Sequence, residues 1–496
     1  MVTAHRESER KYDVTPSTPL PDFAALPEVA RVDDPVREEL DGTYFDLPGL
    51  RLAAAGVTLR RRTGGRDAGW HLKIPAEDGA RTEFRHPLGR AARAVPEELI
   101  RPVRALVRDD QLEPVARIQT KRTVHRLLSV DGTALAEVAD DQVTGQALGS
   151  TVEVSSWREI EVELVDGAEE LLAAAGQLLE ATGAQPAAGP SKLARVLDRR
   201  LPAPPPARKK PRAGDVVLDA VREHHGRLIS ADRGVRLGTP DSVHQMRVAA
   251  RRLRTVLGAF RPVFDRGVTD PIRDELQWLG RVLAGARDTE VLRERLEKLV
   301  DAQPPELVLG PVVARIGSTL AAQARDADAE VAAALDSDRY FALLHALETL
   351  ITEPPLTDEA SAPARAVAPR QVRRTWKRVR RLAVAVHEGD GNLHELRKAA
   401  KRARYAGETA ATVFGKPAKR YAKRMKKLQT VLGEHQDAVV AQDVLRTMGS
   451  QAHLAGENGF TFGVLHHAER DRAEAAAAAH RDAYAAAAKK SLRRWM

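Results

Sequence analysis

Acidic residues alternate with other residues in two short stretches of the N-terminal half. Glu7 and Glu9 are followed by Lys11, and Glu161 and Glu163 repeat the spacing of two. Side chains of a β-strand point alternately to its two faces, so each set would share one face. Grouped carboxylates without histidine or cysteine suit hard divalent ions such as Mg²⁺ or Mn²⁺. The spacing therefore predicts a carboxylate site for one of these ions on a sheet.

Other stretches show the same alternation. Glu159 would share the face of Glu161 and Glu163, Glu137 would share a face with Asp141, and Arg60 would share one with Arg62. Charges inside a closed barrel cannot stay unpaired, so an interior that is acidic on some strands and basic on others would suit a metal-bound polyanion. The alternative is that these charges form outward, solvated faces, as in many antiparallel sheets. If they form a metal site, the crowded carboxylates are expected to repel one another without metal.

The elements that would position these residues are mostly strands. Strands are expected at residues 5–14, 43–46, 57–62, 70–74, 82–85, 117–128, 134–143 and 151–165, and helices at 96–107 and 168–182. Short turns between so many strands predict an antiparallel sheet closed into a barrel over residues 1–201. The proline-rich residues 202–212 predict a stiff linker.

A second set of candidate side chains occurs twice in the C-terminal half. On a helix, His244, Arg247, Arg251 and Arg254 would lie on one stripe, with Met246, Ala250 and Leu253 opposite. Shifted by 150 positions, the set His244, Arg247, Arg251, Arg252 and Arg254 becomes His394, Arg397, Lys401, Arg402 and Arg404, and Lys398 lies beside it. Like charges at this spacing repel, so the stripe favours a bound anion. A solvated basic face is the alternative, but the duplication favours a binding site.

The duplication continues beyond this helix. Leu279, Leu283 and Asp288 recur as Leu428, Leu432 and Asp437. We therefore expect an all-α duplicated helical bundle over residues 213–496, with halves at about 213–350 and 365–496. Its histidines would add positive charge as the pH falls below about 7.5.

Composition limits the partners. The 496-residue chain has a net charge of +9 and no cysteine, and residues 213–496 hold 47 Lys and Arg against 36 Asp and Glu. This balance predicts a polyanion as partner of the C-terminal half. Aromatic residues are only 4% of the chain, so a phosphate polymer fits better than nucleic acid, whose bases need stacking partners. Without a signal peptide or a long apolar run, a cytoplasmic protein that does not enter membranes is expected, while the oligomeric state stays open.

At this point the motifs resemble known families. Glu7-x-Glu9-x-Lys11 resembles the signature of the CYTH superfamily, the triphosphate tunnel metalloenzymes. The later landmarks occur in the family's order: Leu59-Arg60-Arg61-Arg62, Trp70-His71-Leu72-Lys73, Thr120-Lys121-Arg122, Asp141-x-Val143, Glu161-Val162-Glu163-Leu164 and Ser191-Lys192-Leu193. His244-x2-Arg247 and His394-x2-Arg397-Lys398 resemble the two halves of a CHAD domain. The expected fold class is thus α+β with two domains, a triphosphate tunnel followed by a duplicated helical bundle.

The resemblance also implies roles for residues. The metal would be held by Glu7, Glu9, Asp141, Glu161 and Glu163, with Glu137 assisting, and the triphosphate by Lys11, Arg60, Arg62, Lys73, Arg122 and Lys192. The catalytic set would be Glu7, Glu9, Lys11, Glu161 and Glu163. The CHAD half would bind inorganic polyphosphate through His244, Arg247, Arg251, Arg252, Arg254, His394, Arg397, Lys398, Lys401, Arg402 and Arg404. Strand register leaves Lys121 as an alternative to Arg122.

The implied function is metal-dependent hydrolysis of inorganic triphosphate or polyphosphate, in the cytoplasm or at polyphosphate granules. One alternative is a non-catalytic protein that binds polyphosphate and targets granules. Another is an enzyme acting on an organic triphosphate such as thiamine triphosphate, or an adenylate cyclase. A nucleic-acid-binding helical domain is the least favoured.

Overall fold

The chain divides into two compact units, residues 1–206 and 207–496. The computed structural model describes residues 3–76, 81–89, 94–201 and 210–496, and for residues 3–7 it describes the backbone alone. Most of the predicted linker, residues 202–209, lies outside the described residues. Each unit is described by itself below.

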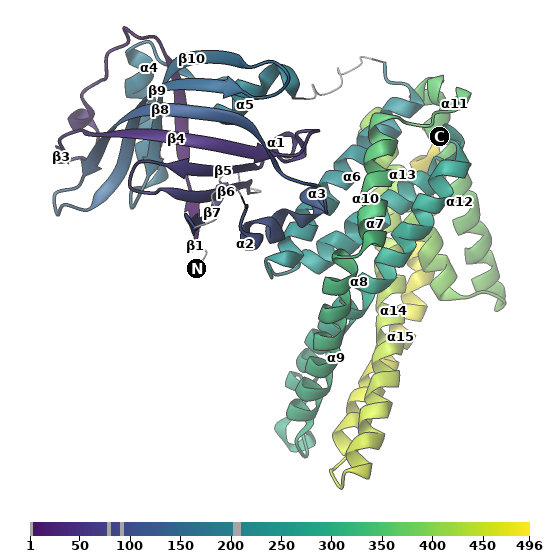
Figure 1. Ribbon diagram of the computed structural model, residues 1–496. Helices are drawn as coiled ribbons and strands as arrows, with labels where there is room; N and C mark the ends of the chain where they lie inside the picture. The colour runs from purple at the N-terminus through teal and green to yellow at the C-terminus, as the bar shows by residue number, and fades with distance from the viewer. Residues whose placement is uncertain (1–2, 77–80, 90–93, 202–209) are drawn as a thin grey trace. The chain divides into compact units, whose positions relative to one another are not determined.

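The first unit is built on one antiparallel sheet (Figure 1). Its described strands are β1 (Thr3–Glu7), β2 (Glu9–Val14), β3 (Arg31–Val32), β4 (Val36–Asp46), β5 (Thr58–Thr63), β6 (Gly69–Pro75), β7 (Arg81–Pro87), β8 (Glu113–Leu128), β9 (Ala134–Ala147), β10 (Glu153–Leu164) and β11 (Gln185–Pro186). The hydrogen-bonded order is β1-β7-β6-β5-β4-β8-β9-β10-β2-β11, and β3 pairs with β8. The predicted antiparallel sheet is confirmed.

The strand predicted at residues 5–14 is divided at Ser8. β1, before Ser8, pairs with β7, whereas β2, after it, pairs with β10 at the other side of the sheet. The chain itself therefore connects β1, at one end of the strand order, with β2, which lies next to β11 at the other end. Among the described residues no ladder pairs β1 with β2, so hydrogen bonds do not close the sheet into a ring.

The two faces of the sheet differ in an unusual way. On β10, Glu159 and Glu161 are buried on one face, while Ile160 and Val162 are buried on the other. The apolar face packs with Leu172 and other residues of α4 (Glu169–Ala181), a helix that the sequence predicted at 168–182. Because this apolar layer forms the core, the other face is free to carry charges.

Short helices complete the unit. α5 (Lys192–Leu197) begins at Ser191, whose hydroxyl accepts a hydrogen bond from the backbone N–H of Ala194 at 3.1 Å. Leu193 and Leu197 then pack against residues of β4, β8 and β9. The other described helices are α1 (Arg51–Ala54), α2 (Glu97–Ile100) and α3 (Arg104–Val107). The single helix predicted at 96–107 is wrong in detail, because a 3₁₀ turn containing Pro102 lies between α2 and α3.

The second unit is helical, as predicted. Its described helices are α6 (Ala213–Arg236), α7 (Ser242–Ala259), α8 (Arg266–Asp301), α9 (Val312–Leu335), α10 (Asp338–Thr352), α11 (Asp358–Ser361), α12 (Ala364–Glu388), α13 (Leu393–Phe414), α14 (Lys416–Leu454) and α15 (Phe460–Ala487). α6 to α9 correspond in order and approximate length to α12 to α15, with α10 and α11 between the two sets. Among the described residues, no helix has both the length and the apolar character needed to cross a membrane.

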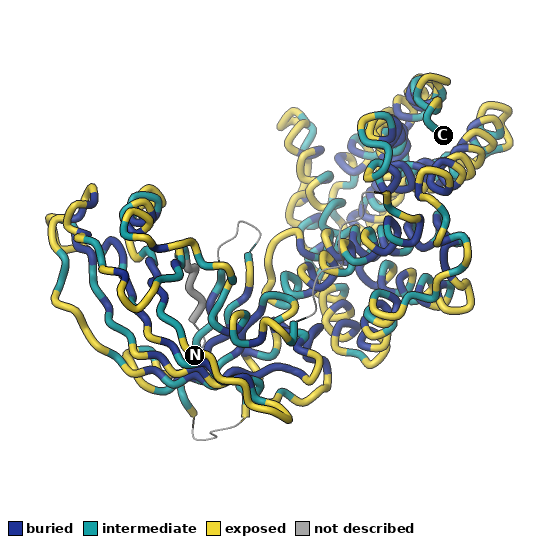
Figure 2. Tube along the Cα trace, turned by 90° about the horizontal axis from the view of Figure 1, so that it is seen from above, coloured by how far each residue is buried: buried dark blue, intermediate teal, exposed yellow. Residues whose placement is uncertain are grey.

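The two sets of helices pack against each other. α7 contacts α13, α6 contacts α12, and α8 contacts α14. Met246, Leu253, Leu396 and Ala403 are fully buried, on the faces that the helical pattern predicted to point inward. α8, α9, α14 and α15 share a second apolar core along their far ends, where they run side by side (Figure 1). Buried stretches lie inside the helical unit and exposed stretches at its periphery (Figure 2).

Candidate functional site

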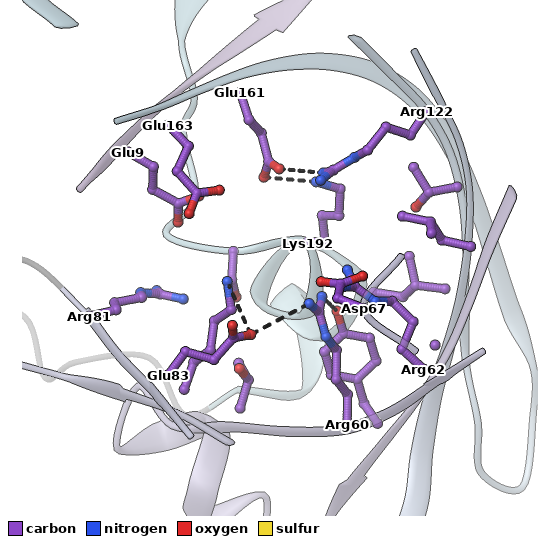
Figure 3. A pocket seen from close by; sticks show the side chains of 18 of the residues that line it. Glu9, Arg60, Arg62, Asp67, Arg81, Glu83, Arg122, Glu161, Glu163 and Lys192 are labelled. Carbon is purple, nitrogen blue, oxygen red and sulfur yellow. Dashed lines mark hydrogen bonds and ion pairs between the residues drawn. The ribbon is translucent and has the colours of Figure 1, made fainter. Parts of the chain in front are cut away.

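The charged face of the sheet lines a cavity. Its empty volume is about 800 Å³, open solvent at its mouth included. Its lining comprises Glu9, Lys11, Leu40, Gly42, Tyr44, Thr58, Arg60, Arg62, Asp67, Lys73, Arg81, Glu83, Arg85, Ile118, Thr120, Arg122, Glu161, Glu163, Ser191 and Lys192. Glu9, Glu161 and Glu163 enter from one side, whereas Arg60 and Arg62 enter from the other, where Asp67 and Glu83 also lie (Figure 3).

The acidic side centres on three carboxylates. Glu159 lies directly opposite Asp141 in the β9–β10 ladder, and Glu161 follows two residues along β10. One oxygen from each of the three carboxylates lies within 4.8 Å of the others, and all three residues are buried. β2 pairs with the far side of β10, which sets Glu9 opposite Glu163. The sheet register thus gathers carboxylates from three adjacent strands.

Lys192 lies among these three carboxylates. Its Nζ is 2.9 Å from Asp141 Oδ2, 2.6 Å from Glu159 Oε1 and 2.8 Å from Glu161 Oε1. Because Lys192 begins α5, the packing of this helix on the sheet holds the start of its side chain in place. The ammonium group therefore neutralises part of the acidic cluster.

Two further cations pair with the cluster. Lys11 Nζ contacts Glu161 and lies 2.9 Å from Glu9 Oε2. Arg122 donates from Nε to Asp141 at 2.8 Å and from Nη2 to Glu161 at 2.6 Å. Burial opposes the charged form of Glu161, but Lys11, Lys192 and Arg122 hold its pKa well below the ordinary value. Glu161 therefore stays ionised.

The basic side is arranged around Glu83. Its Oε1 lies 2.9 Å from His71 Nδ1, 3.7 Å from Lys73 Nζ and 3.8 Å from Arg60 Nη2, and Arg85 contacts its Oε2. Burial opposes ionisation of Glu83, yet these neighbours, His71 and Lys73 foremost, hold its pKa well below the ordinary value. The carboxylate of Glu83 is thus a shared partner of several cations on the basic side.

Some donors on the basic side are not used. In the part of the chain that the structure describes, the Nε atoms of Arg60 and Arg62 are buried without a hydrogen-bond partner. Leaving a buried donor unpaired costs about 1–3 kcal/mol, more for a charged group. An anion with several oxygens, bound between the two sides, would satisfy these donors.

The structure places most of the predicted cavity residues together. Glu9, Lys11, Arg60, Arg62, Lys73, Arg122, Glu161, Glu163 and Lys192 line the cavity, and Asp141 contacts it through Arg122 and Lys192. Arg122 faces the cavity, whereas Lys121 is exposed on the opposite face of β8. Glu137 lies apart from the three carboxylates, 2.9 Å from Arg126 and 3.2 Å from Arg66. The side chain of Glu7 lies outside the described residues.

The sequence analysis assigned neither of two central residues to the site. Glu159 continues the alternation of Glu161 and Glu163 and was expected on their face, but not as a ligand of the metal. Glu83 is the one carboxylate on β7, and apart from Arg85 on the same strand its neighbours come from β5 and β6, so no acidic alternation marked it.

In the second unit, the two predicted stripes come together around Lys401. Burial and repulsion from Arg251, Arg397, Arg247 and Arg404 lower the pKa of Lys401 to about 7. Arg247 and Arg251 lie on α7, and the other three residues lie on α13. The Nε atom of Arg397 is buried without a partner among the described residues. We call these five residues the Lys401 cluster.

Several predicted residues, both in this cluster and beside it, have hydrogen-bond or ion-pair partners. Arg247 Nη1 lies 2.5 Å from Asp288 Oδ1, and Lys398 Nζ lies 2.9 Å from Glu395 Oε1. Arg252 and Arg404 share Glu408, at 3.5 and 2.7 Å, and Arg251 donates to the hydroxyl of the buried Tyr405 at 3.0 Å. Of the two histidines, burial and Arg287 lower the pKa of His244, and the Nδ1 atom of His394 is buried without a partner among the described residues.

Arg402 and Arg254 face a different environment. Arg402 lines a separate pocket with Arg261, Arg266, Arg374 and Arg378. Burial and repulsion from Arg378 lower the pKa of Arg402, and burial with repulsion from Arg273 and Arg402 lowers that of Arg254. The structure therefore divides the predicted basic set between two groups.

Comparisons with known proteins agree with this architecture. The model of the CYTH domain matches residues 5–196, and that of the CHAD domain matches residues 219–446. An uncharacterized protein of Mycobacterium tuberculosis is 41% identical over 495 residues, which cover 95% of this chain and 94% of the relative. The chain belongs to the family of proteins in which a CYTH domain is followed by a CHAD domain.

Two solved structures are also similar. PptA from Streptomyces chartreusis is 21% identical with a TM-score of 0.47, over 55% of this chain and 99% of PptA. The CHAD domain from the plant Ricinus communis is 23% identical with a TM-score of 0.43, over 58% of this chain and 94% of that domain.

Proposed function

We propose that the CYTH domain hydrolyses a phosphoanhydride bond of inorganic triphosphate or polyphosphate with Mg²⁺ or Mn²⁺, and that the CHAD domain binds inorganic polyphosphate. The observation that carries this proposal is the division of the cavity. Asp141, Glu159 and Glu161 gather on one side. Arg60 and Arg62, whose buried Nε atoms have no partner among the described residues, lie on the other side with Glu83 (Figure 3). A metal-bound phosphate chain is the ligand that uses both sides at once.

The carboxylates fit a divalent ion. Asp141, Glu159 and Glu161 offer three closely spaced oxygen ligands without nitrogen or sulfur, the set that Mg²⁺ and Mn²⁺ prefer. Glu9 on β2 and Glu163 on β10, which lie opposite each other, would add further oxygen ligands. When bound, such an ion would neutralise charge on the phosphoryl group that water attacks.

The remaining cavity residues would hold the substrate. Arg60, Arg62 and Lys73 would bind phosphate oxygens on the basic side, and Lys11 and Arg122 would do so next to the carboxylates. An ionised carboxylate, such as that of Glu161, could take the proton of the attacking water. We further propose that residues 3–14, which join β1 at one end of the strand order to β2 near the other end, complete a tunnel around the substrate.

The Lys401 cluster supports polyphosphate binding by the CHAD domain. Five cations converge there from two helices, and the ring of the neighbouring Tyr405 is buried, with 3% of its surface exposed. A buried ring cannot stack on bases, so the site favours phosphates without bases over nucleic acid. Binding to polyphosphate would also localise the protein to cytoplasmic polyphosphate granules.

One assay tests the proposal. Phosphate release is measured from triphosphate, long polyphosphate, ATP and thiamine triphosphate, each with Mg²⁺, Mn²⁺ or EDTA. We expect metal-dependent release from an inorganic substrate. Faster release from thiamine triphosphate would assign an organic substrate. No release from any substrate, with polyphosphate still bound, would establish the alternative of a binding protein.

A further inference from the structure

Lys192 occupies the place where the divalent ion would bind. Its ammonium lies within 2.9 Å of one oxygen from each of Asp141, Glu159 and Glu161, the same three residues whose oxygens are close enough to share an ion. Mg²⁺ binds carboxylate oxygens at about 2.1 Å. An ammonium group and a divalent ion cannot both occupy the centre of one oxygen triangle, so the cluster holds one or the other.

The ammonium group can leave this position while the helix stays. Ser191 caps α5, and Leu193 and Leu197 anchor α5 on the sheet. Lys192 reaches the carboxylates from the first residue of this helix through a flexible chain of four methylene groups. Rotation of the side chain alone would therefore withdraw the ammonium group from all three oxygens, while Arg122 Nη2 stays 2.6 Å from Asp141 Oδ2 and Lys11 stays in contact with Glu161.

The rest of the cavity opposes this rotation when no anion is present. Beside the carboxylates, Lys192 already lies near the positive charges of Lys11 and Arg122, which repel it. The arginines of the basic side lie across the same cavity. A triphosphate in the cavity would favour the rotation of Lys192 away from the carboxylates, because its oxygens would offer the ammonium group a new partner.

We propose that Lys192 competes with the divalent ion for its carboxylates and thereby makes ion binding depend on triphosphate binding. This inference rests on the proposed function. When triphosphate enters, Lys192 moves from the carboxylates to the phosphates, and the divalent ion takes its place. Each ligand then increases the affinity for the other by the same factor.

The test measures Mn²⁺ binding to the full chain by calorimetry, with and without a non-hydrolysable imido analogue of triphosphate. In the wild type, we expect the analogue to raise Mn²⁺ affinity by about 5- to 150-fold. Lys192→Met should bind Mn²⁺ more tightly than the wild type without the analogue and lose most of the increase that the analogue causes. Lys73→Met is the matched control, because it removes the same charge from the same cavity but lies beside Glu83.

The outcomes separate this inference from the proposed function. If Lys192→Met and Lys73→Met change the affinity for Mn²⁺ equally, the change reflects the lost positive charge in general, and direct competition is overturned. Weaker Mn²⁺ binding by Lys192→Met would overturn it as well. If the wild type binds no Mn²⁺ even with the analogue, the metal site of the proposed function fails. Circular dichroism of each variant, matching the wild type, confirms that the comparison concerns folded protein.

Discussion

Replacing Lys401 by methionine should stabilise the helical unit while weakening its binding of polyphosphate. Burial and four arginines lower the pKa of Lys401 from 10.5 to about 7. At about 1.4 kcal/mol per pKa unit, the charged form costs the fold up to about 5 kcal/mol. Salt and movement of the arginine side chains reduce this cost, so a gain of about 2–5 kcal/mol is expected at pH 6.

The sign of the pH dependence follows from proton binding. Between pH 7 and 10.5 the unfolded chain binds the proton of Lys401 more strongly than the folded chain. The free energy of unfolding of the wild type therefore rises with pH over this range, and the full penalty applies only below pH 7. The gain from Lys401→Met should thus fall by about half between pH 6 and pH 9.

Urea unfolding of the full chain, followed by helical circular dichroism at both pH values, measures this gain. Lys398→Met is the control, because Lys398 lies on the same helix but is paired with Glu395, and it should change stability by less than about 1 kcal/mol. The same variants are titrated with long polyphosphate, and Lys401→Met should bind about tenfold more weakly or worse. Destabilisation at pH 6, or an equal gain at both pH values, would refute the assigned environment of Lys401.

Four further outcomes are expected. Polyphosphate affinity of the wild type, measured by calorimetry, should fall as the pH rises from 7 to 9, because binding must then supply a proton to Lys401, and Lys401→Met should lack this dependence. Arg251→Ala and Arg397→Ala should each weaken long-polyphosphate binding nearly as much as the double variant, whereas additive losses would indicate two independent sites. Glu161→Gln should abolish most metal-dependent phosphate release and lower stability by about 3–5 kcal/mol, since it leaves paired cations without a counter-charge, and an unchanged melting temperature would contradict this. Glu83→Gln should lower the free energy of unfolding at pH 7, because the ionised carboxylate of Glu83, with its lowered pKa, stabilises the fold. In urea unfolding, the difference in this free energy between the variant and the wild type should narrow as the pH falls below about 4.5, where Glu83 loses its charge in the unfolded chain first.

The alternation of side chains along single strands predicted much of the candidate site. The spacing of two residues predicted that Glu9 shares a face with Lys11 and that Glu161 shares a face with Glu163. This prediction was possible because side-chain direction along a strand is a local property. Which face is charged and which is apolar depends on what covers the sheet, and α4 covers the face of Ile160. For the same reason the choice between Lys121 and Arg122 needed the register of β8, which the sequence left open.

The expected repulsion among the carboxylates illustrates the limit of local reasoning. In the described residues, Glu161 is paired with Lys11, Lys192 and Arg122, so its environment favours the ionised form. Lys192 belongs to a helix 31 residues beyond Glu161 in the chain. No spacing rule connects the two, since a contact at this distance depends on how α5 packs on the sheet.

In the helical half, the sequence by itself determined the duplication, the inward apolar faces and the two basic stripes, because a helix repeats its faces at a regular interval. Only the tertiary structure decided that Arg247 and Arg251 approach Lys401, while Arg402 turns toward Arg378. It also added Lys401, whose pKa is lowered to about 7, as a group that titrates near neutral pH. The physical reason is that helical periodicity is set by neighbouring residues, whereas the electrostatic environment of a side chain is set by charges that packing brings in from other helices.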